Sequence, residues 1–157
     1  MTVSDDDFTE LEGNAWGGLL GMHARMMRAI EADLQARVGI SHAEFEVMLR
    51  LSWAEGQRLR LQDLDARAIM SRSGISRIVE RLEKSGLVSR ETAPEDRRGA
   101  YAVLTRKGQA EFAEALRGHV ALVRQNFLGL YSGPELNQMA DFWRKQKALV
   151  GLPGSVL

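Results

Sequence analysis

The amino-acid sequence predicts a mainly α-helical domain of six helices that carries one small β-hairpin. Two observations lead to this prediction. Apolar residues recur at intervals of three and four toward both ends of the chain, as they do on one face of a helix. Between them, two short segments rich in Val, Thr and Tyr flank a polar loop that contains proline and glycine, which is the pattern of a hairpin. A chain of 157 residues is long enough for one domain with its own core.

The N-terminal third predicts two helices. The first runs from Phe8 to about Arg37 and is ended by Gly39. The second runs from about His42 to Ala54, with Ser41 before it in the spacing of a capping box. The residues expected on their apolar faces are Trp16, Leu19, Leu20, His23, Met27, Ile30 and Leu34 in the first helix, and Phe45, Met48, Leu49 and Trp53 in the second.

The middle of the chain predicts a turn and a short extended piece in "EGQRLRL", followed by a brief helix in "LQDLDARA". After a break at about 69–71, another helix runs to Gly86. The segments "LVSRET" and "AYAVLT" are the two strand candidates, and "APEDRRG" is the loop that joins them. A long helix then runs from Thr105, a plausible N-cap, to about Tyr131, and the last helix runs from "SGPE" to about Val150.

A short helix, a tight break, a second helix and a hairpin form the pattern of a winged helix-turn-helix. In such a unit the N-terminal residues of the second helix lie near the DNA bases in the major groove. In "SRSGISRIVERLEKSG", a helical spacing of about 100° per residue puts Ile75, Ile78, Val79 and Leu82 on one stripe. Ser73, Arg77 and Lys84 then project from roughly the opposite side, so the exposed face is basic near its start.

Charge is unevenly distributed, although the chain has no net charge. Residues 1–15 hold five acidic residues and no basic one, whereas residues 70–107 hold nine basic and five acidic residues. Arg72, Arg106 and Lys107 lie at helix starts, where the helix dipole disfavours a cation by roughly 0.3–1 kcal/mol. An approaching anion would relieve this conflict, and DNA phosphate is the anion that a basic patch of this kind predicts. A solvated charged surface is the alternative.

Several function classes are not expected. The chain has no cysteine, which excludes disulfides, thiolate zinc sites and cysteine nucleophiles. No apolar run reaches the length of a membrane span, and the first residues lack the features of a signal peptide, so we expect a cytoplasmic protein. We find no phosphate loop, HExxH or nucleophile elbow, and no two histidines share a helix at ligand spacing. We therefore expect no enzyme activity, metal or cofactor.

Residues 71–108 contain three sequence elements with a distinctive combined spacing. They are a helix of the form S-x-S-x-x-S-R-x-x-x-x-L, the segment G-L-V-x-R, and D-x-R followed after five residues by L-T-x-x-G. The residues in these elements are Ser71, Ser73, Ser76, Arg77 and Leu82, then Gly86, Leu87, Val88 and Arg90, then Asp96, Arg98, Leu104, Thr105 and Gly108. Together they resemble the MarR family of bacterial transcriptional regulators, and the order and length of the helices fit this family from about residue 15 to 150.

The resemblance implies one domain over residues 1–157, with dimerisation helices at 8–37 and 106–150 and a winged helix-turn-helix lobe at 41–105. It implies a homodimeric repressor that binds a pseudo-palindromic operator and is released by a small aromatic or anionic ligand. We expect the dimer to use the apolar residues near both ends, although core packing is an equal alternative for each. These residues are Leu11, Phe127, Leu128, Leu130, Leu136, Phe142 and Leu149.

The wing is the hairpin, and the resemblance assigns its residues separate roles. Arg98 would enter the minor groove of DNA, Asp96 would hold its guanidinium, and Arg97 would meet a phosphate. Stabilisation of the hairpin tip by Asp96 and Arg98 is the alternative. The full set of expected DNA-binding residues is Ser71, Arg72, Ser73, Ser76, Arg77, Arg81, Asp96, Arg97, Arg98 and Arg106.

A ligand cleft is expected between the dimerisation helices and the winged lobe. The candidates are Trp16, His23, Met27, Trp53 and His119, and ordinary core packing is the alternative for all of them.

Two further points stay open. Asp65 departs from the family pattern, which has a small apolar residue there, and it could pair with Arg67 or Arg81 or project to solvent. A winged-helix module for protein contacts without specific DNA binding is the alternative function.

Overall fold

The computed structural model describes residues 7–66, 72–93 and 96–150, without the side chains at 65–66, 72–73, 93, 96–98 and 147–150. Within these ranges the chain is mainly α-helical with one small sheet, as the sequence predicts. None of the described helices is long and apolar enough to cross a membrane. The helices are α1 (Glu10–Val38), α2 (His42–Trp53), α3 (Leu61–Ala66), α4 (Arg72–Lys84), α5 (Arg106–Asn126) and α6 (Gly133–Val150), and the strands are β1 (Arg58–Arg60), β2 (Val88–Ala93) and β3 (Asp96–Leu104).

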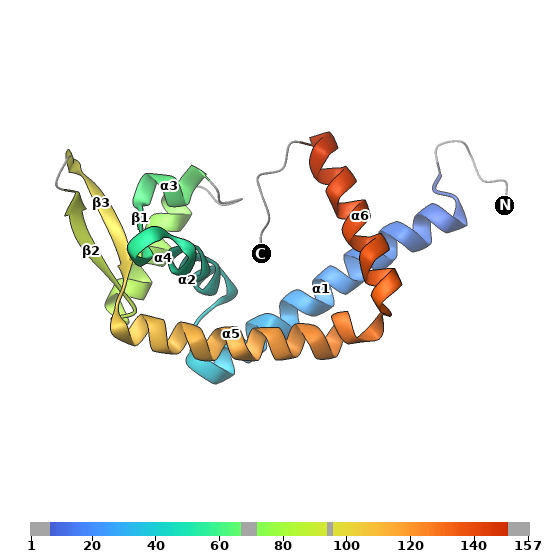
Figure 1. Cartoon of the computed structure of the whole chain (residues 1–157), viewed down its shortest axis with the longest axis horizontal. Coiled ribbons are helices and arrows are strands. Elements are labelled where there is room, and N and C mark those ends of the chain that lie inside the picture. Colours follow the sequence, from blue (N-terminus) through green and yellow to red (C-terminus); the bar gives the residue numbers. More distant parts are fainter. Residues whose placement is uncertain (1–6, 67–71, 94–95, 151–157) are drawn as a thin grey trace.

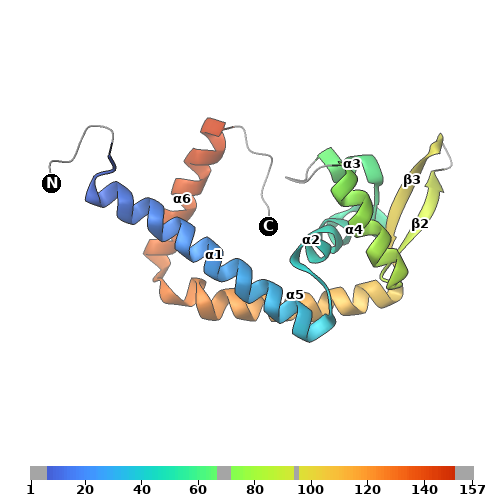
Figure 2. The same cartoon turned by 180° about the vertical axis from the view of Figure 1, so that it is seen from behind.

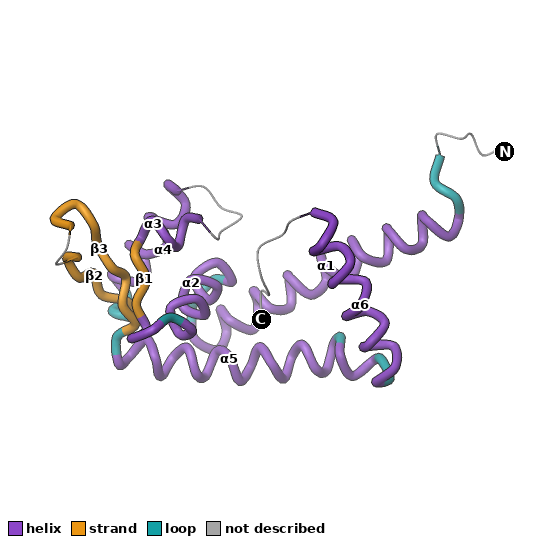
Figure 3. Tube along the Cα trace, turned by 45° about the horizontal axis from the view of Figure 1, so that its top comes forward, coloured by secondary structure: helices purple, strands orange, loops and turns teal. Residues whose placement is uncertain are grey.

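The molecule has two parts (Figure 1). The winged lobe contains α2, α3, α4 and the three strands, and the helical arm contains α1, α5 and α6. Helix α5 begins at the foot of the sheet and runs the length of the arm, and α6 turns up from the end of α5 that is farther from the lobe. The same division is clear from behind (Figure 2) and with the molecule tilted (Figure 3).

The hydrophobic core lies where the winged lobe meets the inner halves of α1 and α5. At its centre, the ring of Phe45 stacks on Phe112 and on His119, with centroid distances of 5.7 and 5.0 Å. Among the described residues, every buried large apolar side chain lies between Met26 and Phe112. The larger members are Met26, Ile30, Leu34, Ile40, Phe45, Val47, Met48, Leu49, Leu51, Leu64, Ile75, Ile78, Val79, Leu82, Leu87, Val88, Leu104 and Phe112.

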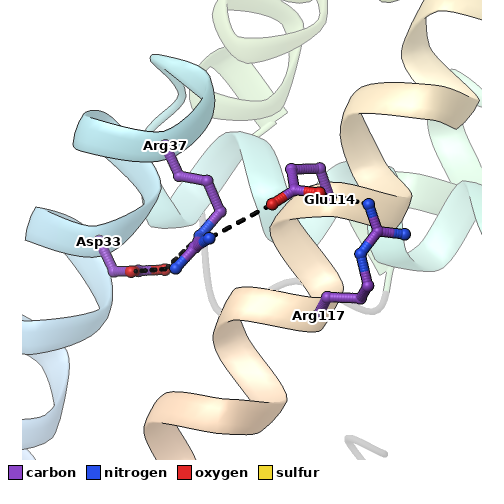
Figure 4. Close-up of polar contacts among 4 residues, drawn as sticks. All are labelled: Asp33, Arg37, Glu114 and Arg117. Carbon is purple, nitrogen blue, oxygen red and sulfur yellow. Dashed lines mark hydrogen bonds and ion pairs between the residues drawn. The ribbon is translucent and has the colours of Figure 1, made fainter.

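Helices α1 and α5 pack in antiparallel directions. Arg25 Nη2 donates to the carbonyl of Asn126 at 2.9 Å, and twelve residues later Arg37 Nη1 contacts Glu114 Oε1 at 3.2 Å. Figure 4 shows Arg37 between Asp33 and Glu114. A Cβ on Gly118 would lie 2.2 Å from Arg37 Nε, so a side chain there would displace the Arg37 guanidinium from this position. Exposed ion pairs of this kind contribute little to stability, so their main effect is to fix the register of the two helices.

The sheet has the strand order β1-β3-β2, and both pairings are antiparallel. The prediction of a loop over residues 93–99 is wrong in its length, because β3 already begins at Asp96, which pairs with Ala93. The register shifts between Thr92 and Ala93. Strand pairing uses backbone groups, so polar side chains such as those in "DRRG" do not prevent it.

Several helix ends and exposures also differ from the sequence-based predictions. Helix α1 begins at Glu10 rather than Phe8, because Thr9 and Glu12 form a capping box there. Helix α5 ends at Asn126 rather than near Tyr131, and a short 3₁₀ turn follows at Leu128–Leu130. Trp53, expected on the apolar face of the second helix, is 55% exposed. Trp16, Leu19 and Leu20 are exposed in this single chain, since periodicity predicts an apolar face but not what covers it.

The end of α4, the sheet and the start of α5 meet at Leu87. Gly86 ends α4 with a positive φ of 71°, and the Leu87 carbonyl accepts a hydrogen bond from Thr105 N–H at 3.1 Å. The Thr105 hydroxyl donates to the Gly86 carbonyl at 2.7 Å and accepts from Gly108 N–H at 3.0 Å. A Cβ on Gly108 would lie 1.9 Å from the Leu87 oxygen. The glycine in L-T-x-x-G is therefore required by the close approach of two backbones.

We expect Gly108→Ala to destabilise the protein by about 2 kcal/mol, because the new methyl group would collide with backbone rather than with a flexible side chain. In a chain of this size that loss lowers the melting temperature by roughly 4–8 °C. Thermal unfolding followed by circular dichroism measures it. Gln109→Ala, at the exposed neighbouring position, is the control and should change the melting temperature little. Equal melting temperatures for both variants would contradict the steric role of Gly108.

Candidate nucleic-acid interface

Helix α4 has one buried face and one exposed face. Ile75, Ile78, Val79 and Leu82 are all buried, which confirms the apolar stripe predicted from the sequence. Ser76, Arg77 and Arg81 are exposed. Helix α4 therefore packs on the lobe along one side and presents a polar, partly basic side to solvent. Of the other expected DNA contacts, Arg72 and Ser73 lie in its first turn with undescribed side chains, and Ser71 lies outside the described residues.

The basic residues around α4 fall into two groups. Arg81 Nε lies 3.1 Å from Glu44 Oε1, Lys84 Nζ lies 3.1 Å from Glu80 Oε1, and Arg90 Nε lies 3.1 Å from Glu83 Oε2. Within the described residues, Arg77 and Arg106 are exposed and form no ion pair. Among the described side chains on α4 and in the first turn of α5, Arg77 and Arg106 are thus the cations most available to an external anion.

The first turn of α5 holds two cations in different surroundings. Lys107 Nζ donates to the carbonyl of Ser85 at 2.9 Å, next to the end of α4, and lies 3.9 Å from Glu111. A cation is favoured at the C-terminal end of a helix, so α4 itself accounts for Lys107 without an external anion. Arg106 has no such partner among the described residues and stays exposed. From the sequence alone Arg106 and Lys107 could not be told apart, because the sequence does not show that the end of α4 lies next to Lys107.

The wing residues Asp96, Arg97 and Arg98 lie in the first part of β3, at the hairpin end farthest from α5. Their side chains are outside the described set, so their expected roles stay predictions. Tyr101, farther along β3, has Arg58 and Arg60 of β1 close to its ring, with guanidinium carbons 4.8 and 5.7 Å from the centroid.

Asp65 departs from the family pattern, and the structure does not decide its partner, because its side chain and all of Arg67 lie outside the described residues. Arg81, the other partner considered, contacts Glu44.

The five expected ligand residues lie in different places within the single chain. Trp16 and His23 are exposed on α1, and Trp53 is exposed at the end of α2. Met27 lines a groove, and the half-buried His119 ring stacks on Phe45 in the core. The single chain therefore supports a binding role best for Met27.

The groove at Met27 has a volume of about 530 Å³. Sequence inspection found Met27 but missed the other lining residues. Met27, Glu31 and Gln35 follow one another at intervals of four along α1, and this mixed apolar and polar stripe was the available signal. Glu31 Oε2 also accepts a hydrogen bond from His42 N–H at 2.7 Å, which connects two of the lining residues. The lining consists of Met27, Arg28, Glu31, Ala32, Gln35 and His42.

His119 is the one described residue with a buried side-chain polar atom, Nδ1, that has no hydrogen-bond partner. Burial lowers the pKa of the His119 imidazole below its ordinary value, and the nearby His42 lowers it further, while Glu46 and Asp33 oppose the shift. The ring is thus held in its neutral form at the junction of α1, α2 and α5. Within the described residues, no group of three or more His, Asp or Glu side chains could hold a metal ion.

The family model of the MarR family matches residues 40–99, which contain α2, α3, α4 and most of the wing. The HTH-type transcriptional regulator YkoM of Bacillus subtilis is 30% identical over 107 residues, a stretch that covers 68% of each chain. The match to the family model thus includes the helix and the hairpin that carry the candidate interface.

Two solved structures from Streptomyces coelicolor are similar to the chain over nearly its whole length. One is AbsC, a MarR family transcriptional regulator, with a TM-score of 0.84 and 32% identity, covering 92% of this chain and 98% of its own. The other is Sco3205, a MarR family regulator in complex with DNA, with a TM-score of 0.84 and 29% identity, covering 95% and 92%. The likeness therefore includes the helical arm as well as the winged lobe.

The lowered pKa of His119 predicts a pH-dependent stability. The unfolded chain takes up a proton near the ordinary value of about 6.5, whereas the folded protein resists protonation until a lower pH. The stabilising contribution is therefore complete above that value and is lost as pH falls through the folded-state pKa. We expect the free energy of unfolding to fall between about pH 7.5 and 5. His119→Gln should make this fall shallower.

Urea unfolding at several pH values measures this effect. His23→Gln, which removes an exposed histidine from α1, is the matched control and should keep the wild-type pH dependence. The same pH dependence in His119→Gln as in the wild type would contradict the role of the buried ring.

Proposed function

Because the chain belongs to the MarR family and is a DNA-binding transcriptional regulator, we propose that it is a homodimeric repressor of a pseudo-palindromic operator. The observation that carries the proposal is that Arg77 is exposed and forms no ion pair on the solvent side of α4. The opposite side of this helix is buried in the core. Arginine is the side chain best suited to bidentate contacts with guanine in the major groove. Because the protein acts on DNA, we expect it to act in the cytoplasm.

Sequence readout would come from the first half of α4, and the wing would add a minor-groove contact. Ser76 and Arg77 are exposed there, and Ser71, Arg72 and Ser73 precede them along the chain. Arg98 would enter the minor groove with Asp96 as its orienting partner, because a narrow minor groove has an enhanced negative potential. Arg97 and Arg106 would contact phosphates, which fix the register of the protein on DNA.

A second copy of the chain would cover the apolar surface of the helical arm. The outer half of α1, the end of α5 and the described part of α6 bury no large apolar side chain within one chain. A contiguous exposed apolar surface marks an interaction site. A twofold dimer would also place two α4 helices about one turn of DNA apart. The large exposed side chains of the arm are Phe8, Leu11, Trp16, Leu19, Leu20, Val120, Leu128, Leu130, Phe142 and Trp143.

The groove at Met27 is the place that best fits an effector. It lies on α1 at the start of α2, where the helical arm joins the winged lobe. Its polar residues include Arg28 and His42, which suit a small aromatic or anionic molecule. A ligand that competed for Glu31 would disturb its hydrogen bond to His42 and thereby the connection between arm and lobe.

The first test is binding of the purified protein to the DNA that flanks its own coding sequence, at two salt concentrations and with excess competitor. We expect saturable, competitor-resistant binding that weakens linearly with salt on a log–log plot. Arg77→Ala should lower the affinity and relax base preference. Arg106→Ala, which would remove one phosphate contact, should instead lower the slope of log affinity against log salt concentration by about 0.9. Asn137→Ala, on the exposed surface of α6, is the control.

The competitor could abolish binding both to the flanking DNA and to duplexes selected from a random pool. That result would favour the alternative function, a winged-helix module for protein contacts. Wild-type affinity and base preference in Arg77→Ala would remove Arg77 from the readout.

We expect Phe142→Glu to weaken the dimer at least about tenfold, because it would bury a carboxylate in an apolar interface. Phe142 is 60% exposed in the single chain, so its replacement should not unfold the monomer. Light scattering after size-exclusion chromatography at several concentrations measures the change. Asn137→Glu, which adds the same charge at another exposed position of α6, should leave the dimer intact. A dimer that survives Phe142→Glu unchanged would place the interface elsewhere.

A further inference from the structure

Glu44 connects two helices through the two oxygens of one carboxylate. Oε2 accepts hydrogen bonds from the backbone N–H and the hydroxyl of Ser41, both at 2.8 Å, and so caps α2. Oε1 faces α4 and accepts from Arg81 Nε at 3.1 Å. The Glu44 side chain is only 13% exposed, whereas that of Arg81 is 57% exposed. The contact is therefore anchored on the α2 side and reaches out to α4, the recognition helix of the proposed DNA-binding unit.

The charge of Glu44 is maintained by these contacts. Burial opposes ionisation, but the hydrogen bonds from Ser41 and Arg81 outweigh it and hold the pKa of the Glu44 carboxyl below its ordinary value. A charge-assisted hydrogen bond is about twice as strong as a neutral one. Arg81 would lose this partner if it turned toward DNA, and the carboxylate would stay behind with one oxygen unpaired.

The same turn of α2 is held by the helical arm. His42, the first residue of α2, donates its N–H to Glu31 Oε2 of α1 at 2.7 Å. The contacts therefore run from Glu31 on α1, through the first turn of α2, to Arg81 on α4. The direction of α4 relative to α1 depends on this turn in addition to the apolar core.

We propose that Arg81 positions the recognition helix by holding α4 to the first turn of α2 through Glu44, and does not itself contact DNA. This inference rests on the proposed DNA-binding function and divides the basic residues of α4 by role. Arg77, one turn before Arg81, is the reader. Arg81 fixes the angle at which α4 presents Arg77 to the bases.

The experiment uses full-length protein and two DNA probes, namely the duplex that the wild type selects from a random pool and an unrelated duplex of equal length. Four variants are compared with the wild type: Arg81→Ala, Glu44→Gln, their double variant, and Lys84→Ala as the matched control. Glu44→Gln is the mildest, because glutamine also completes a capping box and only the charge facing Arg81 is lost. Lys84 pairs with Glu80 within α4 and so holds no second element.

A positioning role predicts that Arg81→Ala and Glu44→Gln each weaken binding to the selected duplex about threefold to tenfold, and that the double variant is no worse than either. The salt slope on that duplex should stay at the wild-type value, since no phosphate contact is removed. Affinity for the unrelated duplex should not fall in Glu44→Gln, which has one negative charge fewer. Lys84→Ala should bind both duplexes as the wild type does.

A direct phosphate contact predicts the opposite pattern. Arg81→Ala would then lower the salt slope by about 0.9, and Glu44→Gln would bind as well as the wild type or better, because it frees the guanidinium. Either result overturns the positioning role, as does wild-type affinity in both single variants. If the wild type selects no duplex at all, the DNA-binding proposal itself fails. This outcome is seen with the wild type alone, so it is distinguishable from failure of the positioning role, which requires the variants.

Discussion

The close contact between the Leu87 carbonyl and the start of α5 is the constraint on which the arrangement of the molecule depends. At this point α4 has just ended, β2 is about to begin and β3 has just passed into α5. The Thr105 side chain and the missing side chain of Gly108 let two backbones meet closely, and Gly86 supplies the left-handed turn that leads there. The recognition helix, the wing and the long helix of the arm therefore share one rigid corner. A change in the direction of α5 must carry both DNA-facing elements with it.

This corner also explains how the arm and the lobe can act as one unit. The lobe is held to α5 at Leu87 and to α1 at the first turn of α2, where His42 donates to Glu31. Between these two points the Phe45 ring is packed on Phe112 and His119 of α5. A close-packed core transmits displacement because it has little free volume to absorb it. In the proposed dimer, the spacing of the two α4 helices would therefore be set by where α1 and α5 pack, at a distance from the DNA.

The fold could be predicted from the sequence to a large extent, because its signals are local. The capping box at Ser41, the glycines at 39 and 86 and the apolar stripe of α4 each depend on neighbours within one or two turns. The capping box of Thr9 and Glu12 at the start of α1 is a local signal that the prediction missed, whereas other differences depend on distant partners. The exposed Trp16 and Trp53 match a helical period, but only tertiary packing decides what covers them. The same holds for the site, since no local pattern relates Arg81 to Glu44, Lys107 to the end of α4, or Met27 to His42.

Only some of the basic side chains near α4 are available to bind DNA phosphates. Arg81, Lys84, Arg90 and Lys107 each lie within 4 Å of a carboxylate, and two of these pairs connect different secondary structure elements. Internal pairs are neutral at long range, so they add little to the attraction for phosphate. Of the described side chains on α4 and in the first turn of α5, Arg77 and Arg106 are the cations that form no such pair, so the proposed attraction would rest on them there. The affinity would then depend on where these two side chains are placed. We propose that a paired residue whose partner lies on another helix, such as Arg81, contributes to binding by setting that placement, so that a residue without a DNA contact can still affect base selection.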